Sequence, residues 1–193
     1  MSLRCIVKRM FIALELPEEV RSRMMDSLLA AREKYKGIGW VRPEGLHLTL
    51  RYLGDTDRVQ EEKIKIELRA LSSSFGPMKI SYEGIGSFGR GQTMSVIWVG
   101  VNDLSGKLQT LAESSEKAAV SCGFPREPRK FSPHITLGRV RDPLSLPPWD
   151  EVRSLISWES TQVLHEGFFL YSSTLSPGGS IYTKEASFLF EKK

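Results

Sequence analysis

The chain has 193 residues, of which 40% are hydrophobic and 26% are charged, and its formal net charge is +4. This composition is that of an ordinary globular protein with a hydrophobic core, and the small charge permits a polyanionic partner without requiring one. No run of 18 apolar residues occurs, so we expect no transmembrane helix. Cys5 and Cys122 lie far apart without metal-ligand spacing, which favours a reducing, cytoplasmic location.

The first half of the chain is predicted to alternate strands with helices. Apolar residues recur every three or four positions from Val20 to Tyr35, which is the spacing of one helical face. In order, the predicted elements are a strand at 10–16, a helix from Val20 to Tyr35, a strand at 46–53, a helix with Val59, Ile64, Leu68 and Leu71 inward, and a strand at 78–82 that leads into a glycine-rich, flexible loop at 84–91.

The same order of elements returns in the second half, at an offset of about 84 to 88 residues. Asp103 is predicted to cap the first helix of this half. In order, the elements are a strand at 94–101, a helix with Leu104, Leu108, Leu111, Ser115 and Ala119 inward, a strand at 131–139, a short helix from Pro147 with Val152, Leu155 and Ile156 inward, and a strand at 162–171.

No low-complexity linker separates the halves, so we predict one domain over residues 1–193. The internal repeat spans about 10–92 and 93–172, and a C-terminal hairpin at 168–190 follows it. Two such halves, related by an approximate two-fold axis, predict an α+β fold of two pseudo-symmetric lobes. Each lobe would be an antiparallel sheet with helices packed outside, and the active cleft would lie between the lobes.

The strand at 46–53 carries a polar face and an apolar face. Because strand side chains alternate, His47, Thr49 and Arg51 are predicted to share the polar face. The apolar face is predicted to carry Leu46, Leu48, Leu50 and Tyr52. The strand would thus present an imidazole, a hydroxyl and a guanidinium side by side.

The polar pattern returns 87 residues later (134 − 47), where His134 and Thr136 share a face. Two of the three histidines of the chain therefore stand in His-x-Thr motifs. An approximate two-fold axis would bring the two motifs to one point. Arg139 follows the second motif, but on an ideal strand it does not share the face of His134. It needs a bulge or a twist, which Gly138 could supply.

Two histidines can perform general acid–base catalysis near neutral pH, because an unperturbed imidazole titrates near ~6.5. One takes a proton from water and the other gives a proton to a leaving oxygen. A threonine hydroxyl on the same face can donate to an anionic oxygen held between the histidines. This arrangement fits a phosphodiester, with Arg51 as the better phosphate ligand of the two arginines.

Other uses of these residues have weaker support. A catalytic zinc normally takes three protein ligands, and only His165 remains beside the two motifs. The counterpart of His165 in the first half is Tyr82, so we interpret His165 as structural. No Gly-x-Ser-x-Gly motif occurs, and neither cysteine has a histidine pattern near it. We therefore predict no metal and no cofactor.

Basic and aromatic residues surround the motifs. The basic cluster at the second motif favours a groove for an RNA backbone, although it also suits an ordinary solvated face; it comprises Arg126, Arg129, Lys130, Arg139 and Arg141. Aromatic residues are candidates for stacking a base, although each also suits a core position; they are Tyr52, Phe88, Phe131 and Tyr171.

The duplicated H-x-T-L motif resembles the two-histidine (2H) phosphoesterases, and more narrowly the RNA 2′,3′-cyclic phosphodiesterase family, also called the 2′-5′ RNA ligase family. The resemblance covers most of the chain. Besides the motifs, it includes the stretches 9–14, 40–41, 51–54, 97–101, 131–133 and 170–179.

The resemblance implies metal-independent hydrolysis of a terminal 2′,3′-cyclic phosphate to a 2′-phosphate. It implies that His47 is the proton donor to the leaving O3′ and that His134 is the proton acceptor that activates water. The further substrate-binding residues that we predict are Thr49, Thr136, Arg51, Arg139, Lys130 and Tyr171. Ser95 and Ser132 stand where relatives often carry basic residues, and this difference bears on RNA affinity and length preference.

Two other functions stay open at this point. The same superfamily admits reversible 2′-5′ RNA ligation, in which a 5′-hydroxyl takes the place of water. A non-catalytic RNA- or nucleotide-binding module is the third interpretation. The expected partner is RNA with a 2′,3′-cyclic phosphate end, such as a tRNA half. We expect no membrane partner, and a monomer, since the internal repeat already supplies both halves of a site.

Overall fold

The structure is a computed structural model that describes residues 7–89, 94–141, 148–177 and 179–191. Its first elements are β1 (Lys8–Glu15), α1 (Glu18–Ser27), α2 (Leu29–Lys34), β2 (Ile38–Trp40), the 3-10 helix η1 (Pro43–Gly45), β3 (His47–Thr56), α3 (Arg58–Ser72) and β4 (Met78–Phe88). The others are β5 (Val96–Asn102), α4 (Lys107–Ser121), β6 (His134–Val140), α5 (Trp149–Ser154), β7 (Thr161–His165), β8 (Gly167–Ser176) and β9 (Gly179–Leu189).

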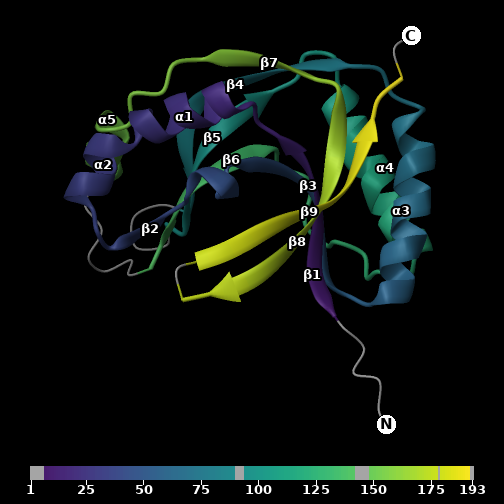
Figure 1. Cartoon of the computed structure of the whole chain (residues 1–193). Coiled ribbons are helices and arrows are strands. Elements are labelled where there is room, and N and C mark those ends of the chain that lie inside the picture. Colours follow the sequence, from purple (N-terminus) through teal and green to yellow (C-terminus); the bar gives the residue numbers. More distant parts are fainter. Residues whose placement is uncertain (1–6, 90–93, 142–147, 178, 192–193) are drawn as a thin grey trace.

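In the described residues, nine strands form one curled antiparallel sheet (Figure 1). The strand order is β7-β4-β5-β6-β3-β1-β8-β9, and β2 pairs with β6. The two halves of this sheet, β7-β4-β5-β6 and β3-β1-β8-β9, meet where Leu48 of β3 pairs with Ile135 of β6. The predicted α+β fold with two antiparallel lobes is confirmed.

The halves of the sheet do not coincide with the halves of the chain. β4 comes from the first half of the sequence but pairs with β5 and β7. β1 pairs with β3 on one side and with β8 of the C-terminal hairpin on the other. Each lobe therefore contains strands that lie far apart along the chain.

Helices cover the two lobes separately. α3 and α4 contact each other and pack on the lobe that contains β3, β8 and β9. α1, α2 and α5 gather at the opposite end of the molecule in Figure 1, where the Tyr35 hydroxyl donates to Glu151 at 2.7 Å. No helix within the described ranges combines the length and apolar character needed to cross a bilayer.

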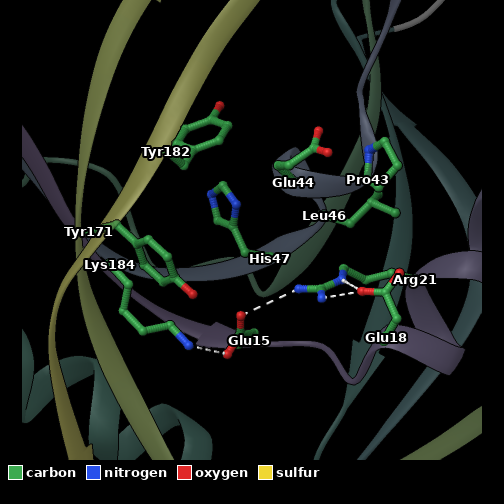
Figure 2. Close-up of a pocket in the computed structure, with 10 residues that line it drawn as sticks. All are labelled: Glu15, Glu18, Arg21, Pro43, Glu44, Leu46, His47, Tyr171, Tyr182 and Lys184. Atoms are coloured by element: carbon green, nitrogen blue, oxygen red, sulfur yellow. Dashed lines mark hydrogen bonds and ion pairs between the residues drawn. The ribbon is translucent and has the colours of Figure 1, made fainter.

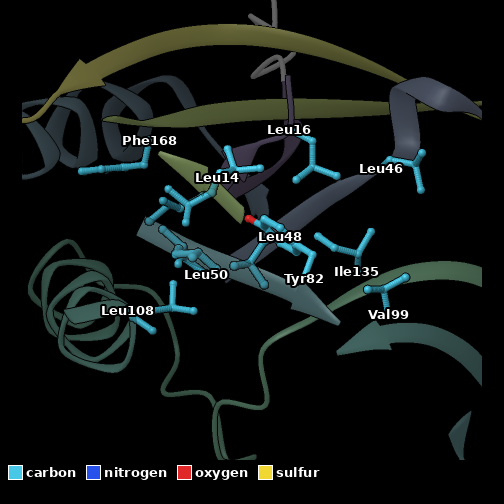
Figure 3. Close-up of a cluster of buried hydrophobic side chains, with 14 of the residues drawn as sticks. Leu14, Leu16, Leu46, Leu48, Leu50, Tyr82, Val99, Leu108, Ile135 and Phe168 are labelled. Atoms are coloured by element: carbon cyan, nitrogen blue, oxygen red, sulfur yellow. The ribbon is translucent and has the colours of Figure 1, made fainter. Parts of the chain in front are cut away.

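The core lies between the sheet and these helices. Figure 3 shows Leu48, Leu50 and Ile135 among its side chains, and Leu48 and Ile135 are fully buried. The apolar residues of both motifs thus anchor their strands in the core, which leaves the histidine-bearing face toward the cleft.

Several helix predictions are corrected. The helix predicted from Val20 to Tyr35 is divided at Leu28, whose N–H donates to Met25 O three residues back instead of four. Val59 and Leu104, predicted to face inward, are 64% and 96% exposed. Val59 lies in the first turn of α3, and Leu104 precedes α4 altogether.

Three other boundaries differ from the prediction or refine it. The N-cap residue of α4 is Gly106 and not Asp103 as predicted, although the Asp103 carboxylate accepts from Leu108 N–H in the first turn of α4 at 2.7 Å. The predicted loop at 84–91 is strand as far as Phe88, and its residues 90 and 91 lie outside the described ranges. The strand predicted at 162–171 is interrupted at Glu166, between β7 and β8. Pro147 also lies outside the described ranges.

Candidate active site

The two His-x-Thr motifs lie beside each other at the centre of the sheet. Leu48 and Ile135, the middle residues of the motifs, pair directly. Extended by one residue on each side, this antiparallel register places His47 across from Thr136 and Thr49 across from His134. The structure therefore brings together the four motif residues that the sequence predicted to converge.

The first motif is followed by an irregularity in strand pairing. Thr49 pairs with Ala13 of β1, and the next pair joins Arg51 to Ile12. Leu50 is therefore an extra residue, and such a bulge shifts the alternation of the side chains that follow. The prediction that Arg51 shares the face of His47 is wrong, because this bulge turns Arg51 to the opposite face.

Arg51 is a structural residue on the helix side of the sheet. Its side chain is 6% exposed and forms an ion pair with Glu116 of α4. Its guanidinium also donates to the backbone carbonyls of Pro125 and Tyr52. Arg51 thus ties β3 to α4 and to the turn that follows α4, and it does not line the cleft.

The second motif has the matching irregularity. The register of β6 against β5 shifts after Thr136, which pairs with Trp98. Leu137 is therefore the extra residue, and Arg139, which pairs with Val96, returns to the face of Thr136. The bulge that Arg139 needs in order to face the cleft is present.

The other residues predicted to contact the substrate lie outside the two motifs. Tyr171 of β8 and Tyr52 of β3 both pair with Phe11 of β1, so all three lie on the cleft face. Tyr52 was predicted on the apolar face, and the bulge at Leu50 is again the reason for the error. Lys130 is exposed in the segment before β6, and its contact with substrate stays a prediction.

His47 is held by aromatic rings. The Phe11 ring stacks on it with a centroid distance of 4.7 Å and an interplanar angle of 28°, and the Tyr182 ring meets it edge-on at 5.3 Å. Burial lowers the pKa of His47 to about 4, with further contributions from the positive charge of Arg139 and from His134. In the free cleft His47 is therefore neutral at pH 7.

His134 has a defined ring orientation. Its Nδ1 lies 2.7 Å from the carbonyl oxygen of Ser132. A carbonyl oxygen can only accept, so Nδ1 carries the proton and the neutral ring keeps Nε2 as an acceptor. Burial lowers the pKa of His134, the Ser132 carbonyl opposes this, and Arg139 lowers the pKa further. The ring is thus suited to take a proton at Nε2.

A pocket of about 290 Å³ opens beside His47, between η1 and the β8–β9 hairpin (Figure 2). We call it the side pocket. Its lining residues are Glu15, Glu18, Arg21, Pro43, Glu44, Leu46, His47, Tyr171, Tyr182 and Lys184.

Glu15 organises the floor of the side pocket. It accepts from Lys184 at 2.7 Å and from Arg21 at 3.3 Å. Burial alone would raise the pKa of Glu15, but the hydrogen bond and charge of Lys184 and the other partners outweigh burial and lower the pKa. Burial, followed by the charge of the nearby Glu15, raises the pKa of the Tyr171 phenol. The carboxylate is ionised and the phenol protonated at neutral pH.

The cleft can therefore bind an anionic group and exchange protons with it. It offers two neutral imidazoles, two threonine hydroxyls and the guanidinium of Arg139. Among the described residues, no group of three or more histidine, cysteine, aspartate or glutamate side chains could hold a metal ion.

Sequence reasoning missed three residues around His47. Phe11, Tyr182 and Glu15 come from β1 and β9, and their contact with His47 or its pocket depends on how these strands pair with β3 and β8. No local pattern encodes that pairing. For Phe11, the available signal was its place in the stretch 9–14, which is one of those that carry the family resemblance.

Comparison with known proteins gives a consistent result. A family model described as the 2′-5′ RNA ligase superfamily matches residues 17–173. The RNA 2′,3′-cyclic phosphodiesterase of Archaeoglobus fulgidus is 35% identical over 175 residues, which cover 90% of this chain and 96% of that protein. The protein of the same name from Thermotoga maritima is 33% identical, with 90% and 91% covered.

Solved structures show the same fold. E. coli LigT in complex with 3′-AMP matches with a TM-score of 0.77 at 24% identity, covering 97% of this chain and 100% of that chain. A protein of Thermus thermophilus matches with a TM-score of 0.76 at 26% identity, covering 94% and 97%.

Proposed function

Because this chain belongs to the 2′-5′ RNA ligase superfamily, we propose that it hydrolyses the 2′,3′-cyclic phosphate at the end of an RNA and leaves a 2′-phosphate. Relatives named RNA 2′,3′-cyclic phosphodiesterase support this activity. The observation that carries the proposal is the pairing of Leu48 with Ile135, because it sets the two His-x-Thr motifs against each other on one face.

In the proposed reaction, water attacks the phosphorus and the bond from phosphorus to O3′ breaks. His134 takes the proton of the water at Nε2, and this role is supported by the hydrogen bond that places the other ring proton on Nδ1. His47 gives its proton to O3′. The two protonation states are regenerated when the histidines exchange protons with solvent.

His47 must gain a proton before it can act as the acid, since its pKa in the free cleft is about 4. A bound phosphate places negative charge beside the ring, and nearby negative charge favours the protonated imidazole. The substrate itself would therefore offset the effects of burial and of Arg139. Acid catalysis at His47 would begin with phosphate binding.

The phosphate oxygens would be held by the hydroxyls of Thr49 and Thr136 and by the guanidinium of Arg139. These groups share the cleft face of β3 and β6. Lys130 and Tyr171 would contact the substrate farther from the scissile bond. Arg51 is not included, because its guanidinium is engaged with Glu116 on the other face.

The partner would be an RNA with a 2′,3′-cyclic phosphate end, for which a tRNA half is one example. We further propose that the protein acts as a monomer in the cytoplasm. The cleft supports a monomer, because both histidines come from the same chain and meet at one strand pair.

A short RNA with a 2′,3′-cyclic phosphate end tests this function. With EDTA present, we expect conversion to the 2′-phosphate, identified by mass and by resistance to a 3′-phosphatase. We expect kcat/KM to fall roughly 10²–10⁴-fold in His47→Ala and in His134→Ala. Full activity in either variant, or activity that requires an added divalent metal, would contradict the two-histidine mechanism.

The family description also supports the reverse reaction, 2′-5′ ligation. Adding a second RNA with a 5′-hydroxyl to the same assay separates the two. Hydrolysis predicts the 2′-phosphate as the main product, whereas ligation predicts a joined RNA. RNA binding without either product would favour a binding module.

A further inference from the structure

A second hollow lies between α2 and β2, at the end of the molecule opposite to α3 and α4 (Figure 1). We call it the α2–β2 groove. It has a volume of about 670 Å³, and its lining residues are Leu29, Arg32, Glu33, Lys36, Ile38, Gly39, Trp40 and Arg141. We propose that this groove binds the single-stranded backbone of the RNA upstream of its cyclic phosphate end. The inference rests on the phosphodiesterase function proposed above, and it adds a preference for RNA over a cyclic mononucleotide.

The charges of the α2–β2 groove favour a polyanion. Three cations and one carboxylate give it a net charge of +2 (3 − 1); these residues are Arg32, Lys36, Arg141 and Glu33. In the part of the chain that the structure describes, none of the three cations forms an ion pair, whereas both cations of the side pocket are paired with Glu15. Lys36 and Arg141 are also exposed. Unpaired cations in a groove bind nucleic-acid phosphates by displacing their counterions.

The groove continues the cleft face of the sheet. Gly39 of β2 pairs with Arg139 of β6, so both residues point to the same face. The Arg141 side chain covers Gly39, because a Cβ added at Gly39 would lie 2.8 Å from Arg141 Nε. Arg139 and Arg141 are therefore successive cations on one face, with Cα atoms roughly 7 Å apart along the chain. Neighbouring phosphates of an extended RNA strand are separated by a similar distance.

A cyclic mononucleotide held at the histidines does not reach the far end of the groove. Arg141 is seven residues after His134 (141 − 134). At about 3.3 Å per residue, and with one residue taken up by the bulge, the separation is roughly 20 Å. A chain of nucleotides spans this distance. The groove therefore acts on the binding of RNA and not on the chemistry at the cyclic phosphate.

The groove also offers apolar surface beside its cations. The Trp40 indole N–H donates to the Tyr35 carbonyl oxygen at 3.0 Å, which fixes the ring. The Arg32 guanidinium is held at the groove by its donation to the Val41 carbonyl oxygen at 2.8 Å. Leu29 is 62% exposed. Cations that follow the backbone, next to surfaces on which bases rest, are typical of sequence-tolerant binding of single strands. We therefore expect no base preference in this groove.

Equilibrium binding of a product RNA tests the groove without depending on turnover. The probe is a single-stranded RNA of about ten nucleotides that ends in a 2′-phosphate, and the variant combines Lys36→Met with Arg141→Met. We expect the affinity at low salt to fall about tenfold. The slope of log affinity against log salt should fall by about 1.4, because each phosphate contact of a single strand contributes about 0.7.

The matched control removes two cations elsewhere. It combines Arg69→Met with Lys107→Met, because both residues are exposed on α3 and α4, at the opposite end of the molecule. The control should bind the RNA as the unmodified protein does. An equal loss in the control and in the groove variant would show that only the net charge of the protein matters, and would overturn the groove.

Kinetics separate the groove from the catalytic cleft. For the same RNA ending in a 2′,3′-cyclic phosphate, the groove variant should raise KM about tenfold and leave kcat unchanged. For adenosine 2′,3′-cyclic phosphate, kcat/KM should stay at the level of the unmodified protein. An equal loss on both substrates would place the two cations in the cleft and contradict the inference.

The outcomes also separate this inference from the proposed function. Unchanged RNA affinity and salt dependence in the groove variant would overturn the groove, and hydrolysis of the cyclic phosphate by the same protein would leave the phosphodiesterase function standing. RNA binding that weakens in the groove variant, in a protein that hydrolyses no cyclic phosphate, would support the groove and refute the function.

Discussion

At the scale of a single residue, the charge of Arg139 affects both histidines of the cleft. Its guanidinium lowers the pKa of both His47 and His134 in the free protein, and burial acts in the same direction as the larger cause. The two imidazoles are thereby kept neutral until an anion arrives. The same charge that binds the phosphate thus also sets the protonation state from which the reaction begins.

Removing this charge should move the pH dependence of the reaction. In Arg139→Met, the pKa of both histidines rises toward the ordinary value, so both limbs of the kcat/KM profile should shift to higher pH. KM should also rise, because a phosphate ligand is lost. Arg69→Met is the control, since Arg69 is exposed in the last turn of α3, on the helix side of the sheet. A profile that falls in height without moving would show that Arg139 does not act on the histidines in the free protein.

At the scale of an element, the bulges at Leu50 and Leu137 decide which residues the strands present. On ideal strands, Arg51 would face the cleft and Arg139 would face the helices, as the alternation in the sequence predicted. One extra residue in each strand reverses both assignments. The cleft therefore gains Tyr52 and Arg139 at equivalent positions, five residues after each histidine.

The corrected position of Arg51 predicts a stability defect. Arg51→Met removes a buried partner of Glu116 and should lower the free energy of unfolding by roughly 3 kcal/mol, as for a broken buried ion pair. Urea denaturation measures this loss, and Arg129→Met should show almost none because its pair is exposed. Activity per folded molecule should stay at the level of the unmodified protein. A large rise in KM with unchanged stability would instead restore Arg51 to the substrate site.

At the scale of the whole molecule, the histidines couple stability to pH. His165 shares a 2.7 Å hydrogen bond with Tyr82 between β7 and β4, and burial lowers the pKa of His165 to about 4, as it does for His47. The unfolded chain has ordinary imidazoles near ~6.5. Below that pH the unfolded state binds more protons, so the stabilisation present above pH ~6.5 is lost as the pH falls toward 4.

Unfolding at two pH values checks this coupling. Between pH 7.5 and pH 5, each of these two histidines should lower the free energy of unfolding by about 2 kcal/mol. His165→Gln should reduce the difference between the two pH values, whatever it does to stability at pH 7.5. Carboxylates of lowered pKa, such as Glu15, titrate below this window. An equal pH effect in the variant would contradict the assignment to His165.

The sequence predicted the features that depend on its internal repeat. It did not predict the features that depend on bulges or on the exchange of strands between the lobes. The order of elements and the meeting of His47 with His134 followed from periodicity and from the duplicated motif. The bulges could not be predicted from the sequence, because Leu50 and Leu137 look like ordinary apolar positions of a strand. The exchange of β4 and β8 between lobes also could not be predicted, because strand neighbours are chosen by long-range packing. Tyr182 lies beside His47 because its strand, β9, pairs with the exchanged strand β8.

The place of β1 in the sheet has a consequence for synthesis on the ribosome. β1 lies between β3, which follows it closely, and β8, whose Ser173 is 164 residues from its partner Arg9 (173 − 9). Until residues 167–176 have been translated, one edge of β1 has no partner, and unpaired edges are templates for aggregation. We therefore expect the nascent chain to depend on chaperones or rapid elongation. The lobe that holds His47 therefore contains both the first and the last strands to be translated.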